Sequence, residues 1–291
     1  MLIIKVHYGL GNQLFQYALA RSLSIRKKAD FRLDVSFFST DVFTGHPRVY
    51  QLDRFNIKEQ LAGPDEIGRY TQPSFLKRGW RALERKLLPY YKQRVVNEVR
   101  LDYDENILNV NDDAYIFGYW QDYRYFSGIE DVLRKELTFK GEPVGRNKEL
   151  SDMIRETESV SLHIRRGDYL TDAYTVSNVG SCDADYYRRA VDEIAASVTD
   201  PVFYIFSDDP VWVKENFRIG FPVVYVDNNP EEMAVEDLRL MSSCKHHITA
   251  NSSFSWWGAW LAAHEGKRVI CPRVWRSKGP DMFKPSGWKA I

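Results

Sequence analysis

The stretch SLHIRRGDY, residues Ser161 to Tyr169, decides how the second half of this chain is interpreted. An apolar alternation from Val160 to Ile164 leads into it and predicts the end of a strand. Arg165 and Arg166 follow, and a guanidinium is a planar fork of donors that matches phosphate oxygens two at a time. We interpret the stretch as a phosphate clamp. The alternative is a surface turn whose arginines pair with Asp168 and solvent.

The rest of the second half alternates between apolar strands and amphipathic helices. Strands are expected over 160–164, 202–206, 223–226, 247–250 and 268–271, and helices over 185–198, 210–217, 230–242 and 254–264. This order predicts a parallel sheet with helices on both faces, which binds its ligand at the carboxyl ends of the strands. Polar residues gather at those ends, at 163–168, 207–209, 227–229, 251–253 and 272–273.

Three polar features of the second half have a chemical interpretation and an ordinary one. The run from Asn251 to Phe254 precedes a helix and suits phosphate oxygens, or it is an ordinary serine cap. The Asp237 carboxylate suits the paired N–H donors of guanine, or it faces solvent on its helix. Asp208 and Asp209 suit a divalent metal, or they begin the helix at Pro210; we favour the second and expect no metal.

The first half is less regular. A buried strand over 2–6 is followed by a glycine turn and a helix over 12–28 that Asn12 is expected to cap, a geometry that suits anions. A second strand is expected over 31–35 and a helix over 129–137. Glycine and proline between 141 and 145 mark the domain boundary, giving domains 1–143 and 144–291. The C-terminal tail is a candidate to pack back on the first domain.

Composition excludes several classes of function. Forty basic and forty acidic residues give a formal net charge of zero, which argues against nucleic acid as a partner. Three cysteines without a CxxC pair give no disulfide framework or zinc site. The apolar run at 2–6 is too short for a signal peptide, and no stretch is long enough to span a bilayer, so we expect a cytoplasmic protein.

Two segments of the first half are unusual. Residues 76–100 carry eight Lys or Arg against two Glu, together with Trp80 and several leucines. Such a basic amphipathic segment either lies on an anionic membrane surface or covers the core as a solvated helix, and the second is favoured. Residues 115–126 are rich in aromatic side chains.

Five motifs together resemble the bacterial α-1,2-fucosyltransferases of glycosyltransferase family 11. They are GLGNQLFQYA (9–18), GYWQDYRYF (118–126), SLHIRRGDY (161–169), FSDDPVWVKENF (206–217) and ITANSSFSWWGAWL (248–261). Their order and spacing run through nearly the whole chain and are weakest at 41–110 and near the C-terminus. One position departs from the family: Tyr8 stands where a glycine is common.

The resemblance implies an α/β chain with the GT-B fold, in which two Rossmann-like domains face each other across a cleft. It implies that GDP-L-fucose binds the C-terminal domain, with no cofactor and no metal. It further implies inverting transfer of fucose to the 2-hydroxyl of a terminal β-galactoside. The acceptor is then an O-antigen or blood-group-H-like glycan, a lipid-linked glycan or a lactose-type sugar.

The resemblance also assigns residues to the donor site. Arg165 contacts the β-phosphate of the donor, and Arg166 and His163 support it. The loop of Asn251, Ser252, Ser253 and Phe254 binds the diphosphate, and Asp237 reads guanine. Asn12 and Gln13 reach the diphosphate or the fucose from the first domain.

Other assignments follow from chemistry. Inversion needs a base on the face of fucose opposite GDP, and Asp168 is the candidate, with a supporting role beside the arginines as its alternative. Tyr119, Trp120 and Gln121 are candidates for the acceptor wall, with the aromatic core as the alternative. The basic segment at 76–100 is a candidate for peripheral contact with the inner membrane. Other readings are a chitin-oligosaccharide or protein O-fucosyltransferase, or a non-catalytic GDP- or glycan-binding protein on the same scaffold.

Overall fold

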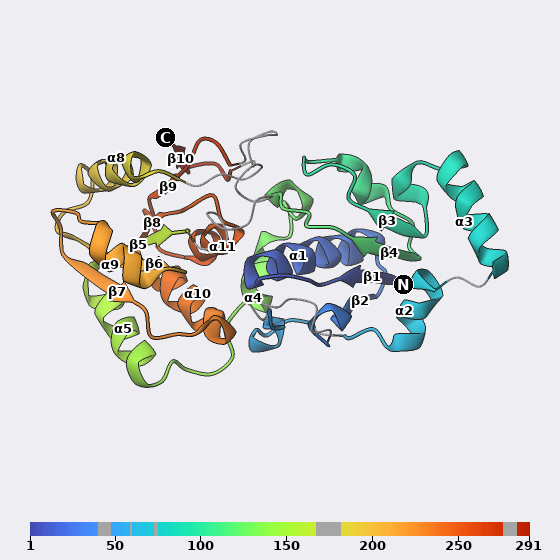
Figure 1. Ribbon diagram of the computed structural model, residues 1–291, viewed down its shortest axis with the longest axis horizontal. Helices are drawn as coiled ribbons and strands as arrows, with labels where there is room; N and C mark the ends of the chain where they lie inside the picture. The colour runs from blue at the N-terminus through green and yellow to red at the C-terminus, as the bar shows by residue number, and fades with distance from the viewer. Residues whose placement is uncertain (40–47, 59, 73–74, 167–181, 276–283) are drawn as a thin grey trace. The chain divides into compact units, whose positions relative to one another are not determined.

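The computed structural model describes residues 1–39, 48–58, 60–72, 75–166, 182–275 and 284–291. The chain divides into two compact units, Met1–Thr138 and Phe139–Ile291. Each unit contains its own parallel sheet (Figure 1). Short 3₁₀ turns connect the elements at Ser36–Ser39, Leu52–Arg54, Tyr90–Lys92, Glu105–Asn109, Tyr123–Tyr125 and Glu231–Met233.

The first unit is built on a four-stranded parallel sheet in the order β2-β1-β4-β3. Its strands are β1 (Leu2–Lys5), β2 (Phe31–Asp34), β3 (Val95–Asn97) and β4 (Ala114–Phe117), and its helices are α1 (Leu10–Lys27), α2 (Pro64–Thr71), α3 (Phe75–Leu87) and α4 (Glu130–Glu136). The apolar residues of β1 are buried because parallel strands are covered on both faces. β3 was not predicted, because three residues carry too little periodicity.

The helix α1 begins two residues earlier than predicted. Gly9 occupies the N-cap position, and its carbonyl accepts the N–H groups of Asn12, at 2.9 Å, and Gln13, at 3.2 Å. Leu10 is already buried inside the helix. Asn12 therefore lies in the first turn, and the prediction that it caps the helix is wrong.

The residue before this turn has a left-handed backbone. Tyr8 has a φ of 63°, a conformation that favours glycine because a Cβ crowds the following carbonyl oxygen. Its ring stacks on Tyr119, with centroids 5.6 Å apart, and contacts Phe37 at 5.2 Å. The strained position is therefore occupied by a side chain that aromatic contacts hold in place.

Comparing two substitutions of Tyr8 isolates the backbone strain. Both Tyr8→Gly and Tyr8→Ala remove the ring, but only alanine keeps a Cβ at positive φ. We expect the glycine variant to have the larger free energy of unfolding, by about 1 kcal/mol. Equilibrium urea unfolding of both variants measures the difference, and equal stabilities would show that position 8 is unstrained.

The second unit contains a six-stranded parallel sheet in the order β10-β9-β8-β5-β6-β7. The strands are β5 (Glu158–Ile164), β6 (Pro201–Ser207), β7 (Val223–Val226), β8 (His246–Ile248), β9 (Val269–Cys271) and β10 (Lys289–Ala290). The helices are α5 (Gly145–Glu156), α8 (Ala184–Ala195), α9 (Pro210–Asn216), α10 (Ala234–Ser243) and α11 (Ser253–Leu261). The predicted alternation of strands and helices is confirmed.

Helices cover both faces of this sheet. Phe203 and Ile205 of β6 pack with α8 and α9 in one apolar cluster, whereas Tyr204 and Phe206 pack with α5 and α10 in another. Figure 1 shows α8 and α5 on opposite sides of the sheet. The alternation of side chains along β6 thus divides the core into two layers.

The last strand belongs to the second unit. Lys289 and Ala290 of β10 pair with Ile270 and Cys271 of β9. The C-terminal strand therefore extends the second sheet. α5 was also not anticipated from the sequence.

Candidate active site

The strand order of the second sheet places one topological switch point between β5 and β8. The chain runs from β5 outward to β6 and β7, and then returns to β8 and continues outward to β9 and β10 on the other side. Open α/β sheets bind ligands at such a point, at the carboxyl ends of the strands. Arg165 and Arg166 follow β5, and Asn251 to Ser253 follow β8. The two predicted phosphate-binding segments therefore flank the switch point.

Acidic side chains at the end of β6 hold both arginines. Arg165 Nε lies 3.2 Å from Asp208 Oδ2, and Arg166 Nε lies 3.5 Å from Asp209 Oδ2. Asp208 Oδ1 also accepts the backbone N–H of Arg166, at 2.9 Å. Both arginine side chains are about three-quarters buried, so their guanidinium groups are fixed at the edge of the sheet. Both ion pairs are made at Nε, and the 3.5 Å separation between Arg166 and Asp209 is an ion pair without a hydrogen bond.

Trp212 gives Arg166 a second support that the sequence did not reveal. The Arg166 guanidinium carbon lies 3.2 Å from the centroid of the Trp212 ring, a cation–π contact. Trp212 lies in α9, whose N-cap Asp209 accepts the Trp212 N–H at 3.2 Å. The run of Asp209 and Pro210 therefore begins a helix as predicted, and both Asp208 and Asp209 pair with arginines.

Among the described residues, no group of three or more His, Cys, Asp or Glu is placed to hold a metal ion.

His163 is a neutral neighbour of this pair. It is buried, and burial together with the charge of Arg165 lowers the pKa of His163 to about 3. Its ring lies 5.9 Å from that of Phe254 in α11. At neutral pH the imidazole adds no positive charge to the site, so the arginines supply the cations near the switch point.

The segment after β8 presents a helix start to the same point. Ser252 is the N-cap of α11, but its side chain makes no capping hydrogen bond. The first-turn N–H groups of a helix have no partner within the helix, which makes the start of α11 suited to anions. Asn251 is buried, and its side chain accepts from Cys182 Sγ and donates to the Trp275 carbonyl, each at 3.5 Å. Asn251 therefore fixes the loop that carries the serines.

Asp237 is partly buried rather than fully solvent-facing. It lies in α10, and Asn229 Nδ2 donates to its Oδ1 at 2.7 Å. Asn229 Oδ1 accepts from Asn147 at 2.8 Å, and Asn147 in turn accepts from Asn228 at 2.8 Å. Burial raises the pKa of Asp237 to about 7. A cluster of three asparagines, Asn147, Asn228 and Asn229, therefore orients a carboxyl group that titrates near neutral pH.

Gln13 of the first unit has a structural role. It is fully buried, and its Nε2 donates to the carbonyls of Tyr8, at 2.9 Å, and Val49, at 2.8 Å. Its Oε1 accepts the N–H of Gln51 at 3.0 Å. Because these bonds occupy the amide, the expected contact of Gln13 with the donor is not available in this conformation.

The residues predicted for the acceptor wall divide into surface and core. Trp120 is 1 % exposed and has a left-handed φ of 54°, so the interpretation of its ring as a sugar-binding surface is wrong. Glu98 fixes this turn by accepting the N–H groups of Tyr119, at 2.7 Å, and Trp120, at 3.0 Å. Tyr119 and Gln121 are partly exposed, and Gln121 Nε2 donates to Asn12 Oδ1. Asp168, the candidate base, lies outside the described residues.

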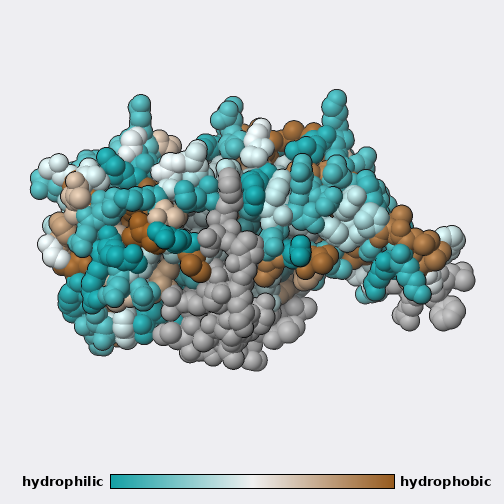
Figure 2. Space-filling view, turned by 90° about the horizontal axis from the view of Figure 1, so that it is seen from above, coloured by the Kyte–Doolittle hydropathy of each residue, from teal (hydrophilic) through white to brown (hydrophobic). Residues whose placement is uncertain are grey.

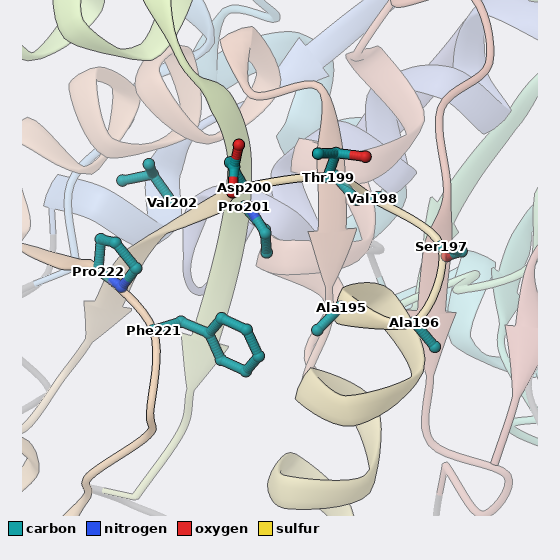
Figure 3. A pocket seen from close by; sticks show the side chains of 10 residues that line it. All are labelled: Ala195, Ala196, Ser197, Val198, Thr199, Asp200, Pro201, Val202, Phe221 and Pro222. Carbon is teal, nitrogen blue, oxygen red and sulfur yellow. The ribbon is translucent and has the colours of Figure 1, made fainter.

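A surface hollow of about 560 Å³ lies at the other edge of the second sheet (Figure 3). It is lined by the end of α8, the start of β6 and the segment before β7, with the Phe221 ring on one side. Asp200 is the one charged residue in its lining. A hollow without cations at the amino ends of the strands does not suit a diphosphate.

Comparison with known proteins agrees with this geometry. A family model described as "Glycosyl transferase family 11" matches residues 98–289 of this chain. An α-1,2-colitosyltransferase of Escherichia coli is 33% identical over 284 residues, which are 94% of this chain and 92% of that protein. Galactoside α-(1,2)-fucosyltransferase 2 of Mus musculus is 33% identical over 130 residues, 44% of this chain and 37% of that protein. The crystal structure of the fucosyltransferase NodZ from Bradyrhizobium, 13% identical, superposes with a TM-score of 0.50 and covers 89% of this chain and 92% of that one.

Two α/β units with parallel sheets, together with the likeness to NodZ, define the GT-B fold. Within that class, this chain belongs to glycosyltransferase family 11. No helix in the described parts of the chain is both long and apolar enough to cross a bilayer.

Proposed function

We propose that this glycosyltransferase moves L-fucose from GDP-β-L-fucose to the 2-hydroxyl of a terminal β-galactoside, with inversion at the transferred carbon. The observation that carries the proposal is the pair of fixed arginines after β5 at the switch point, next to the start of α11. The α-1,2 linkage named in both the bacterial and the mouse relative supports the position of transfer.

The donor site performs the chemistry by stabilising the leaving group. When the bond between fucose and phosphate breaks, GDP gains negative charge and the sugar becomes oxocarbenium-like. Arg165 is assigned to the β-phosphate and Arg166 supports it, while Ser252, Ser253 and the Phe254 N–H hold the remaining oxygens. Groups that are fixed before the reaction stabilise this charge without reorganising, so they are the main source of rate enhancement.

Asp237 is assigned to guanine. Its carboxylate would accept the N1–H and the exocyclic amine, a pair of donors that adenine and uracil do not offer. Asn229, which follows β7, fixes one oxygen of this carboxyl group by donating to Oδ1. Asp237 would therefore select GDP-sugars over other nucleotide sugars.

The acceptor is assigned to the first unit. Tyr119 and Gln121 remain as its wall, with the Tyr8 ring stacked on Tyr119. Asn12, bonded to Gln121, would reach the donor sugar. Trp120 and Gln13 are excluded from these contacts because they are buried.

Asp168 is assigned as the base that removes the proton of the acceptor hydroxyl. The test is the pH profile of kcat/KM for Asp168→Asn. Loss of the base removes the acidic limb of the profile and lowers the rate by about 100-fold or more. A folded, active variant with an unchanged profile would exclude this role.

Colitosyl transfer is a second candidate, favoured by the bacterial relative. Colitose is L-fucose without its 3-hydroxyl, so the two donors share a diphosphate site and differ in one hydrogen-bonding group. A site that hydrogen-bonds this hydroxyl discriminates strongly against the sugar that lacks it.

A donor and acceptor panel separates these functions. Rates are measured with GDP-fucose and GDP-colitose, each against lactose, a chitin oligosaccharide and a folded protein acceptor, and the linkage of the product is determined. The proposal predicts the highest kcat/KM for GDP-fucose with lactose and a 2-linked product. A preference for GDP-colitose, or transfer only to chitin or protein, would contradict it.

A further inference from the structure

The helix α3 presents an apolar face away from the core of the first unit. Trp80 is 73 % exposed and Leu87 is 70 % exposed, and Leu83 between them is also exposed. Their spacing of three and four residues places them on one side of the helix. Figure 1 shows α3 at the margin of the first unit, and Figure 2 shows brown and teal residues side by side at that end. Amphipathic helices of globular proteins normally turn the apolar side inward, so this orientation needs a reason.

The polar side of α3 is the side that contacts the rest of the unit. Arg81 donates to the carbonyl of Tyr70 at the end of α2. Glu84 Oε1 accepts the backbone N–H of Arg94, at 2.6 Å, just before β3. Arg81 and Glu84 lie about a quarter-turn around the helix from the strip of Trp80, Leu83 and Leu87, so these two contacts hold α3 at its side and leave the apolar strip exposed.

The charge of α3 is strongly unbalanced in a chain whose formal net charge is zero. The sequence of the helix, FLKRGWRALERKL, contains five basic residues and one acidic residue. Arg85 and Lys86 are exposed and, within the described parts of the chain, form no salt bridge. An exposed apolar strip flanked by lysine and arginine is typical of a helix that lies in the interface of an anionic membrane.

We propose that α3 binds the surface of a membrane rich in anionic phospholipids, with Trp80, Leu83 and Leu87 inserted between headgroups and Lys86, at the border of this strip, against phosphates. A second copy of this chain fits the surface less well. Two α3 helices packed by their apolar faces would bring their basic residues together, and like charges repel. The proposal is independent of the donor and acceptor proposed above.

Sedimentation of the full chain with vesicles tests the proposal. Vesicles of phosphatidylcholine with about 30 % phosphatidylglycerol are compared with phosphatidylcholine alone. The full chain is expected to sediment with the anionic vesicles at about 0.05 M salt and to be released at about 0.5 M, because salt screens the charges. The variant Lys86→Glu, which changes the charge at the border of the strip by two units, is expected to lower the partition coefficient about 30-fold, and Trp80→Ser/Leu87→Ser at least about tenfold.

Matched variants in the second unit control for general changes in charge and surface. Arg188→Glu/Arg189→Glu reverses two exposed charges on α8, and Val144→Ser removes an exposed apolar side chain. Both controls should bind vesicles like the wild type, and thermal unfolding should show that every variant is folded. No binding to anionic vesicles, or equal binding by the α3 variants, would overturn the proposal. The proposal would also be overturned if the chain did not bind vesicles but formed a dimer in sedimentation equilibrium, and if Trp80→Ser/Leu87→Ser abolished that dimer.

Discussion

Replacing Arg165 by alanine is expected to lower turnover more than about 100-fold, the scale for removing one fixed group that stabilises developing charge. The reason is geometric: Asp208 holds the guanidinium at the carboxyl end of β5, where the leaving diphosphate is assigned. Steady-state release of GDP at saturating donor and acceptor measures the effect.

Three further variants separate charge from position. Arg165→Lys keeps the charge but loses the planar fork, so it should recover only part of the activity. Asp208→Asn keeps Arg165 but weakens its support, and we expect a loss of about tenfold. Arg188→Ala, which changes an exposed arginine on α8, should be as active as the wild type. Turnover of a folded Arg165→Ala protein near the wild-type value would refute the clamp.

Replacing Asp237 by asparagine is expected to weaken GDP binding about 100-fold, because two hydrogen bonds to a partly buried carboxylate are lost. The same variant should be at least as stable as the wild type at pH 8. Its amide oxygen still accepts from Asn229, and the cost of burying a charge disappears. Opposite effects on binding and stability distinguish a specificity residue from a structural one. Isothermal titration with GDP and UDP, together with urea unfolding, measures both.

The pKa of Asp237 gives this prediction a pH dependence. Burial raises the pKa to about 7 from its ordinary value of 3.8, so the folded state binds a proton more tightly than the unfolded state. The contribution of this group to stability is therefore full below pH 4 and is lost as the pH rises through 7. The affinity for GDP changes with pH in the opposite direction to the stability, because guanine binds only the deprotonated carboxylate. Affinity should be constant above pH 7 and fall about tenfold per unit below it. An Asp237→Asn variant with the wild-type pH profile would contradict this assignment.

The second sheet and the positions of its two candidate phosphate-binding segments were predictable because their signals are local. Each strand is a short apolar run, and each polar group follows a strand directly, as Arg165 follows β5. The parallel order then brings those ends to one edge. The start of α11 at Ser253 was predicted to within one residue for the same reason.

The supports of the site were not predictable because they join distant segments. Trp212 reaches Arg166 only because β6 lies beside β5, and Asn147 reaches Asn229 only because α5 packs against α10. A run of aromatic residues has the same sequence pattern in a protein core as on a sugar-binding surface. The sequence therefore did not show that the Trp120 ring is buried and is not part of the acceptor wall. Gln13 was misassigned because an amide in a first helical turn gives no sign of the backbone groups that will occupy it.

The most direct test of the central claim is the release of GDP from GDP-fucose in EDTA, with and without lactose. The proposed function predicts release that depends on lactose, continues in EDTA and yields a fucosyl group linked to the 2-position of galactose. Tight binding of GDP over UDP without release would support the donor site and refute lactose-type sugars as acceptors. Absence of both release and GDP binding would contradict the assignment of the switch point between β5 and β8 as a GDP-sugar site.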